Sequence, residues 1–299
     1  MSIAITGATG HIGRRIAQIL MDEYRDVRVI GRNAATIQAW TDSSAQAFVG
    51  SLEDSAFLTR AFDKAEAVFA MIPPNPQAED FRGFQNRVGA SIAAAVEKTG
   101  VERVVNLSSQ GAHLSGGTGP IAGLYDQEQR LNAIRHVHVV HLRPAYFMEN
   151  LMMNISMIRS QNLNGTPLRA DLLFPMIATR DIAAAAAGYL LRLTFTDKTV
   201  RDLLGERDLS MEEATSILGR AIGKPDLPYV QFPYDAAEKV MIGSGMSRDL
   251  ARLYVEMNRA LNEGLIMNGV HRTAENTTDT PFETFAMEFA AMYEEVQTK

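Results

Sequence analysis

The chain has 299 residues, of which 46% are hydrophobic, so it can bury a large core and does not have the composition of a disordered protein. Its net charge of -6 and its lack of basic runs argue against a nucleic-acid or anionic-membrane surface, because such a surface needs positive charge to neutralise phosphates. It contains no cysteine, which excludes disulfides, thiolate nucleophiles and thiolate metal ligands, so any redox role requires a bound cofactor.

No apolar stretch reaches the ~20 residues that a membrane-spanning helix needs. The first predicted strand begins at residue 2 or 3, which leaves no room for a secretory signal before it. We therefore expect a cytoplasmic protein whose partners are small molecules or proteins, with no nucleic-acid or membrane partner.

An apolar strand is predicted over residues 2–6, and it runs through a glycine-rich turn into a predicted helix over 11–24. Gly7 allows a tight turn, Gly10 allows the backbone to approach a phosphate, and Gly13 allows the helix to pack closely on a sheet. The free N–H groups at the start of the helix then face an anion. Three glycines alone are a weak motif, but the strand before them and the helix after them predict a dinucleotide pyrophosphate site.

The second predicted strand, 27–30, bears on which nucleotide binds. An NAD site usually carries an acidic residue about 20 positions beyond the glycines, where it holds the ribose 2′-hydroxyl. Here the strand is followed by Arg32, whose planar cationic fork suits a 2′-phosphate. We predict NADP(H), the alternative being that Arg32 is an ordinary solvated residue. His11 either contacts the pyrophosphate or faces water.

Strands and helices continue to alternate through the first half of the chain, at the spacing of right-handed βαβ units. The further strands are predicted at 47–49, 67–72, 103–107 and 137–142, and the helices between them at 34–41, 54–63, 80–99 and 123–134. The fold class is therefore α/β, a doubly wound parallel sheet with helices on both faces.

Beyond residue 150 the sequence becomes helix-rich, with isolated strand-like pieces at 198–204 and 229–232. We predict a dinucleotide-binding domain over 1–150, to which 176–205 returns. A smaller, mostly helical substrate lobe takes up 151–175 and 206–299. Parallel sheets bind ligands beyond the carboxyl ends of their strands, so the lobe should form the second wall of a cleft at that edge.

His136 and His138 share one face of a predicted strand, a spacing that some zinc sites use. With no cysteine and no nearby acidic residue, a solvated strand start is the better interpretation, and no metal site is predicted.

Motifs spread over nearly the whole chain resemble the NmrA-like family of atypical short-chain dehydrogenases/reductases, and are most similar to its NADPH-dependent quinone-reductase-like members. These motifs are Thr6–Gly13, Arg32–Asn33, Ala67–Pro74, Val104–Ser109, Leu142–Leu151, Ala178–Ile182, Leu203–Gly205 and Pro281–Phe285. Each motif alone is weak, but their order and spacing are specific.

The resemblance implies a Rossmann-like domain that binds NADP(H), with a small carboxyl-terminal lobe over the nicotinamide. It places Gly7, Thr9, Gly10, His11, Ile12 and Gly13 around the pyrophosphate and Arg32 at the adenosine phosphate. It places Met71, Ile72 and Pro73 beside the riboses, and Pro144, Ala145 and Tyr146 at the nicotinamide. Ser51 stands where the family often has an acidic residue near the adenine, which leaves the adenine contacts open.

The catalytic pattern departs from the wider superfamily. Its ordinary members use a Tyr followed four residues later by a Lys, whose ammonium lowers the pKa of the phenol. Here Tyr125 is followed by Gln129, and Leu124 stands four residues before Glu128, where the NmrA-like pattern would allow a Lys or His. Tyr125 stays a catalytic candidate without its lysine. Ser108 or Ser109 could orient a substrate, although serines after a buried strand more often bond the backbone of the following turn.

The absence of a strong proton donor restricts which substrates such a site could reduce. Hydride addition to a ketone leaves an alkoxide that needs a proton donor, whereas a quinone leaves a phenolate-like anion, with basicity near a pKa of about 10, that water can protonate. The aromatic and methionine-rich segment 146–157 suits a flat apolar acceptor, with Tyr146 the preferred catalytic candidate. The alternative is that its methionines and Phe147 are the ordinary core of a buried helix.

We therefore predict an NADPH-dependent reductase that transfers hydride to a quinone or a similar apolar conjugated electrophile. The alternative is a non-catalytic NADP(H)-binding redox sensor that acts through a protein partner. A homodimer is compatible with either function.

Overall fold

The computed structural model describes residues 2–23, 25–41 and 45–295. Within them, a seven-stranded sheet has the order β10-β6-β5-β4-β1-β2-β3, and every pair of neighbouring strands is parallel. Its strands are β1 (Ser2–Thr6), β2 (Asp26–Gly31), β3 (Gln46–Val49), β4 (Ala65–Ala70), β5 (Arg103–Leu107), β6 (His138–Pro144) and β10 (Lys198–Leu203). The chain builds outward from β1 in one direction as far as β3 and then in the other from β4, so the strand order reverses between β1 and β4.

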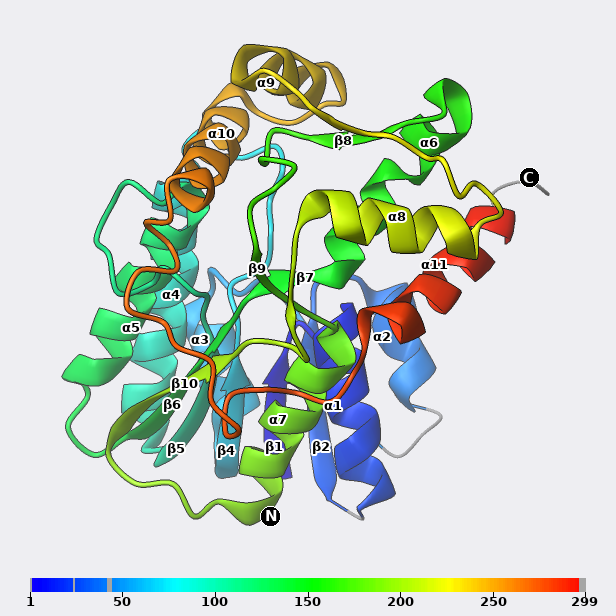
Figure 1. The fold of residues 1–299 in the computed structure, drawn as a ribbon. Helices are drawn as coiled ribbons and strands as arrows, with labels where there is room; N and C mark the ends of the chain where they lie inside the picture. The colour runs from blue at the N-terminus through cyan, green and yellow to red at the C-terminus, as the bar shows by residue number, and fades with distance from the viewer. Residues whose placement is uncertain (1, 24, 42–44, 296–299) are drawn as a thin grey trace.

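Helices cover both faces of this sheet (Figure 1). On one face lie α1 (His11–Asp22), α2 (Ala34–Thr41) and α7 (Thr179–Arg192), and on the other lie α3 (Ser55–Phe62), α4 (Phe81–Thr99) and α5 (Ala122–Ala133). Successive side chains of a strand point to opposite faces, and here both faces are apolar: Ile3 and Ile5 face the first group of helices while Ala4 faces the second. This is the predicted Rossmann-like α/β fold.

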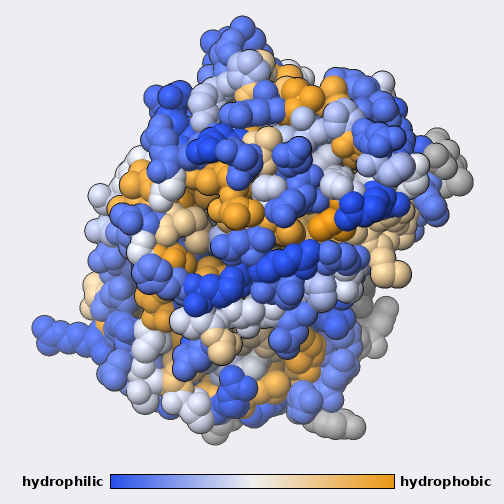
Figure 2. Space-filling model, in the orientation of Figure 1, coloured by the Kyte–Doolittle hydropathy of each residue, from blue (hydrophilic) through white to orange (hydrophobic). Residues whose placement is uncertain are grey.

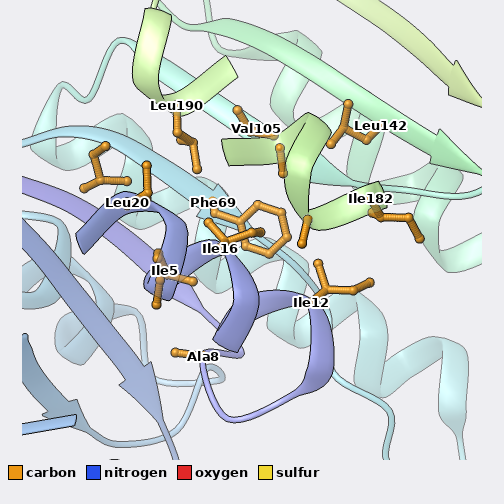
Figure 3. Packing of buried hydrophobic residues seen from close by; sticks show 14 of the residues in the cluster. Ile5, Ala8, Ile12, Ile16, Leu20, Phe69, Val105, Leu142, Ile182 and Leu190 are labelled. Carbon is orange, nitrogen blue, oxygen red and sulfur yellow. The ribbon is translucent and has the colours of Figure 1, made fainter. Parts of the chain in front are cut away.

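Helix α1 packs through an apolar stripe with one residue per turn. Ile12, Ile16 and Leu20 belong to one buried cluster with Phe69 of β4 and with Ile182 and Leu190 of α7, and Ile16 lies next to the Phe69 ring (Figure 3). The 3.6-residue period of a helix brings positions four apart onto one side, which is why the sequence pattern predicts this face. Helices α1 and α7 are therefore packed into one layer.

The rest of the chain forms a lobe beyond the carboxyl ends of the strands (Figure 1). Its helices are α6 (Ile155–Gln161), α8 (Met211–Ala221), α9 (Tyr234–Gly243), α10 (Arg248–Asn262) and α11 (Phe282–Glu295), with the 3-10 turns η1 (Gly119–Ile121) and η2 (Met148–Asn154). Smaller sheets join β7 (Tyr146–Phe147), β9 (Phe174–Ile177) and β11 (Asp208–Leu209), and pair β8 (Asn164–Thr166) with β12 (Tyr229–Gln231). The lobe has its own core, centred on Phe174, Phe282, Phe285 and Phe289.

Some predicted boundaries differ from the structure. Strand β4 covers Ala65–Ala70 rather than 67–72, so Met71 and Ile72 follow the strand instead of ending it. The strand-like piece at 198–204 belongs to the large sheet as β10, while Phe174–Ile177 pairs inside the lobe. The predicted ranges also include residues 1, 24, 42–44 and 296–299, which lie outside the described residues.

Candidate functional site

The glycine turn after β1 has the geometry that the sequence predicts. Gly7 has φ +69°, a left-handed conformation, and the Gly10 N–H donates a hydrogen bond to the Gly7 carbonyl at 3.0 Å. A Cβ on Gly13 would lie 2.3 Å from that same carbonyl oxygen, so only glycine lets α1 pack against the turn. The turn and the first turn of the helix are therefore closely packed together.

The start of α1 is open to an anion. Its N-cap residue, Gly10, supplies no side-chain cap, and its first turn contains no acidic residue. A Cβ on Gly10 would contact only the Gly7 oxygen at 3.5 Å, and His11 is exposed beside it. The first backbone N–H groups and the positive end of the helix dipole thus face open space, which fits a pyrophosphate.

Arg32 lies directly after β2 and is exposed. In the described part of the chain it makes no hydrogen bond or ion pair, and the neighbouring Asn33 caps α2 by accepting from the Ala35 N–H at 2.9 Å. A Cβ on Gly31 would lie 3.4 Å from the Thr9 methyl group, so the end of β2 is adjacent to the glycine turn. An unpaired arginine that follows the strand end next to this turn fits the NADP(H) that the family resemblance implies.

Met71, Ile72 and Pro73 border the point where the strand order reverses. The Thr6 hydroxyl accepts a hydrogen bond from the Met71 N–H at 2.9 Å and donates to the Phe69 carbonyl at 3.1 Å, which joins the ends of β1 and β4. The Met71 sulfur lies 2.6 Å from the place where a Cβ on Gly7 would stand, so its side chain covers the turn. This side-chain bond takes the Met71 N–H out of the sheet and explains why β4 ends at Ala70.

Ser108, Glu128 and Arg143 form a buried polar network next to the strand ends. The Ser108 hydroxyl donates to Glu128 Oε1 at 2.5 Å, and Arg143 donates to both carboxylate oxygens, at 2.9 Å from Nε and 2.5 Å from Nη2. Glu128 is 2% exposed and the Arg143 side chain 15%. The Ser108 proton is therefore committed to the carboxylate, which argues against a substrate-orienting role for this serine.

His141 is buried beside this network and is hydrogen-bonded on both ring nitrogens. Nδ1 accepts from Asn106 Nδ2 at 3.1 Å and Nε2 donates to Asn132 Oδ1 at 3.0 Å, which is the pattern of a neutral ring. Burial lowers the pKa of His141 to about 4, and the positive charges of Arg143 and Lys198 act in the same direction against Glu128. His141 is 1% exposed and serves the core.

We predict that His141 makes the protein less stable as the pH falls from about 6.5 to about 4. In that window the unfolded histidine binds a proton that the folded one does not, so the free energy of unfolding decreases by about 1.4 kcal/mol per pH unit, roughly 3 kcal/mol in all. Urea titrations across this pH range should show this decrease in the wild type, and the decrease should be absent in His141→Gln. The exposed His136 provides the control, since His136→Gln should keep it. An unchanged pH dependence in His141→Gln would contradict the assignment.

The catalytic candidate Tyr125 lies on α5, one turn before Glu128. It is partly buried and makes no hydrogen bond within the described residues. Leu124, next to it, packs against the lobe core. The position where the family pattern would allow a base is therefore occupied by an apolar contact between α5 and the lobe.

Pro144, Ala145 and Tyr146 carry the chain from β6 into the lobe. The Pro144 carbonyl accepts from the Gln110 N–H at 3.1 Å, and the Ala145 N–H donates to the Leu203 carbonyl at 2.9 Å. The Tyr146 ring meets the ring of Phe174 edge-on at 5.5 Å, and its hydroxyl has no hydrogen-bond partner among the described residues. Burial, reinforced by Tyr229, raises the pKa of Tyr146 well above its usual value, so the phenol stays protonated across the neutral range.

The predicted pocket wall 146–157 is only partly a surface. Met148 is buried in the lobe core, so for this methionine the core alternative is correct, and Leu151 is buried in the same cluster. Met153, in contrast, is 78% exposed. Apolar side chains do gather across the middle of the face shown in Figure 2, between the lobe and the sheet layer.

Sequence reasoning assigned no role to Glu149 or Thr179. The Glu149 carboxylate accepts hydrogen bonds from the Thr179 N–H at 2.9 Å and the Thr179 hydroxyl at 2.5 Å. Both residues belong to motifs that carry the family resemblance, but they are 30 positions apart. No local pattern in the sequence indicates that they meet.

Within the described residues, no group of three or more His, Asp or Glu side chains is placed to hold a metal ion. No helix in that part of the chain is long and apolar enough to cross a membrane.

Comparison with known proteins adds two curated relatives. A (4-alkanoyl-5-oxo-2,5-dihydrofuran-3-yl)methyl phosphate reductase of Streptomyces griseus is 26% identical over 80% of this chain and 80% of its own length. The uncharacterized oxidoreductase YesF of Bacillus subtilis is 26% identical over 88% of this chain and 85% of its own length.

Solved structures share the fold at lower identity. The Escherichia coli NADPH-dependent quinone oxidoreductase QOR2, complexed with NADPH, is 18% identical, with a TM-score of 0.77 over 99% of both chains. The Citrobacter triphenylmethane reductase complexed with NADP(H) is 19% identical, with a TM-score of 0.79 over 97% of this chain and 100% of the other. The model of the NmrA-like family matches residues 1–286, and the chain therefore belongs to the NmrA-like family.

Proposed function

We propose that this protein is an NADPH-dependent reductase that transfers hydride to a quinone or a similar apolar conjugated electrophile. The observation that carries the proposal is the uncapped start of α1 beside the free guanidinium of Arg32, which suits a pyrophosphate and a further phosphate. The names of the relatives support an enzyme, since one is a reductase and the other an oxidoreductase. They also favour it over a non-catalytic sensor.

The cofactor would lie across the carboxyl ends of β1 and β4, with its nicotinamide toward the lobe. The pyrophosphate would lie against the glycine turn and the start of α1, at Gly7, Thr9, Gly10, His11, Ile12 and Gly13. Arg32 would bind the 2′-phosphate. Met71, Ile72 and Pro73 would border the riboses, while Pro144, Ala145 and Tyr146 would flank the nicotinamide. We propose, on the same basis, that 1–150 with 176–205 forms the dinucleotide-binding domain and that 151–175 and 206–299 form the substrate lobe.

When bound, NADPH would supply a hydride, that is, two electrons together with one proton. The protein's own groups hold the acceptor close, exclude bulk water and donate a hydrogen bond, and the second proton comes from solvent. Conjugated acceptors suit this site because their reduced anions are weak bases. The names of the compared enzymes agree with this class: quinones, triphenylmethane dyes and a 4-alkanoyl-5-oxo-2,5-dihydrofuran ring are all conjugated.

The direct test is NADPH oxidation with a panel of small quinones, followed by absorbance at the nicotinamide band. Saturable turnover supports the reductase. Tight NADPH binding without turnover, together with an NADPH-dependent protein partner, would support the sensor instead. No binding of either pyridine coenzyme to the folded protein would overturn the whole proposal.

Tyr146 is proposed to donate its free hydroxyl to the acceptor oxygen. We expect Tyr146→Phe to lower kcat/KM for quinones about tenfold, because one hydrogen bond to a developing anion is worth about 1.5 kcal/mol. Tyr125→Phe is the matched comparison on α5, and a similar loss there would move the donor role to Tyr125. Since the pKa of Tyr146 is raised, we expect no ionisation of this phenol in the pH–rate profile between about 6 and 10.

A further inference from the structure

The first turn of α7 is capped by a residue from another part of the chain. Its N-cap residue, Ala178, provides no side-chain cap. The Glu149 carboxylate takes that place: Oε1 and Oε2 accept from the Thr179 N–H at 2.9 and 3.1 Å, and Oε1 accepts from the Thr179 hydroxyl at 2.5 Å. A carboxylate at this end also interacts favourably with the helix dipole.

Helix α7 is packed against the helix that forms the proposed pyrophosphate site. Ile182, in the first turn of α7, belongs to the same buried cluster as Ile12 in the first turn of α1, and Figure 3 shows the two side chains in the same region of the core. Because the two helices are closely packed, the start of α7 and the start of α1 hold a fixed position relative to each other.

Glu149 also lies two residues after β7, the strand that carries Tyr146. Tyr146 pairs with Met176 of β9 and Phe147 with Ile177, and β9 continues through Ala178 into α7. The chain leaving β7 is thus bonded to the chain leaving β9. Strand pairing sets the register of Tyr146, and the bond from Glu149 to Thr179 fixes it to α7.

A second carboxylate in the first turn of α7 binds the segment just before α11. Asp181 accepts from the hydroxyls of Thr278 at 2.7 Å and Thr280 at 2.5 Å, just before α11. The first turn of α7 therefore contacts α1, the chain that leaves β7 and the segment that leads into α11.

We infer that Glu149 is a positioning residue. By capping α7 it fixes the position of Tyr146 relative to α1, and therefore the distance between the acceptor and the nicotinamide. The inference rests on the proposed reductase function and adds the residue that aligns its two walls. Misplacement of a reacting group by about 1 Å can cost about a hundredfold in rate.

Glu149→Ala and Glu149→Gln form the test, with Glu288→Gln as the matched control. Glu288 forms an exposed ion pair with Arg180 in the same turn of α7, so its loss should change little. The single-turnover rate of hydride transfer to a quinone and the steady-state kcat are both measured with NADPH and with NADPH deuterated at the transferred position, and NADPH affinity is measured by calorimetry.

For Glu149→Ala we expect the hydride-transfer rate to fall at least about tenfold and the isotope effect on kcat to rise, while the NADPH dissociation constant changes less than about twofold. Glu149→Gln should recover part of the rate, because its amide oxygen still accepts the Thr179 N–H. A purely structural role would lower the melting temperature but leave the hydride-transfer rate of the folded protein unchanged, and that result would overturn the inference.

Hydrogen exchange of the cofactor-free protein separates this inference from the proposed function. In the Glu149 variants the amides of Tyr146 and Phe147 should exchange faster than in the wild type, while the amides of α1 should exchange at the wild-type rate. In Glu288→Gln all of these amides should exchange at the wild-type rate. If the wild type does not turn over, the proposed function fails, and unchanged exchange in both Glu149 variants then refutes the positioning role as well. If Glu149→Ala does not fold, Glu149→Gln supplies both readouts.

Discussion

Replacing Gly10 by Ala should weaken NADPH binding about 10- to 100-fold while leaving the protein folded. A Cβ at this position meets only the Gly7 oxygen at 3.5 Å, and the backbone of Gly10 is extended, with φ -86° and ψ 170°, so alanine fits the protein itself. The new methyl group would stand where the pyrophosphate approaches the first turn of α1. Since each hydrogen bond to a charged group is worth about 1.5–3 kcal/mol, losing one weakens binding about 10- to 100-fold. Calorimetric titration with NADPH measures the loss.

Gly13→Ala is the comparison that separates a cofactor effect from a folding effect. Its Cβ would lie 2.3 Å from the Gly7 carbonyl oxygen, so the helix must move away from the turn. We expect it to lower the free energy of unfolding by roughly 1–3 kcal/mol, whereas Gly10→Ala should cost no more than about 1 kcal/mol for the poorer N-cap. Gly10→Ala with wild-type NADPH affinity would show that no phosphate lies at this turn.

Replacing Arg32 by Ala should weaken NADPH binding much more than NADH binding. Arg32 is exposed, directly follows Gly31 next to the glycine turn, and is free of ion pairs within the described residues, so it is available to a 2′-phosphate. A charge-assisted contact of this kind is worth about 1.5–3 kcal/mol, and we expect NADPH affinity to fall about 10- to 100-fold. NADH lacks that phosphate and should bind the variant as it binds the wild type.

Arg60→Ala controls for the loss of one positive charge. Arg60 is exposed in the last turn of α3, a helix that ends just before β4 begins, so it lies toward the opposite edge of the sheet from the glycine turn. It should leave both affinities unchanged at physiological salt. Equal losses of NADPH and NADH in Arg32→Ala would show that this arginine does not read the phosphate.

Local chemistry in the sequence determined the fold class and the edge of the sheet at which we propose the cofactor site. A glycine turn, the 3.6-residue stripe of Ile12, Ile16 and Leu20, and strands that are apolar on both faces each act over a few residues, so they can be read without knowing the rest of the chain. The same holds for Arg32, because a residue that follows a parallel strand must lie at its carboxyl edge.

Only the tertiary structure decided how the two walls of the proposed site are joined. Glu128 meets Arg143, and Glu149 meets Thr179, through contacts between elements far apart in the chain, and any buried carboxylate must find such a partner because an unpaired buried charge is costly. The sequence shows that these residues are polar, but which cation or N–H they bond depends on packing between layers. That packing buries Met148 and leaves Met153 exposed, although the sequence of this segment does not distinguish the two methionines.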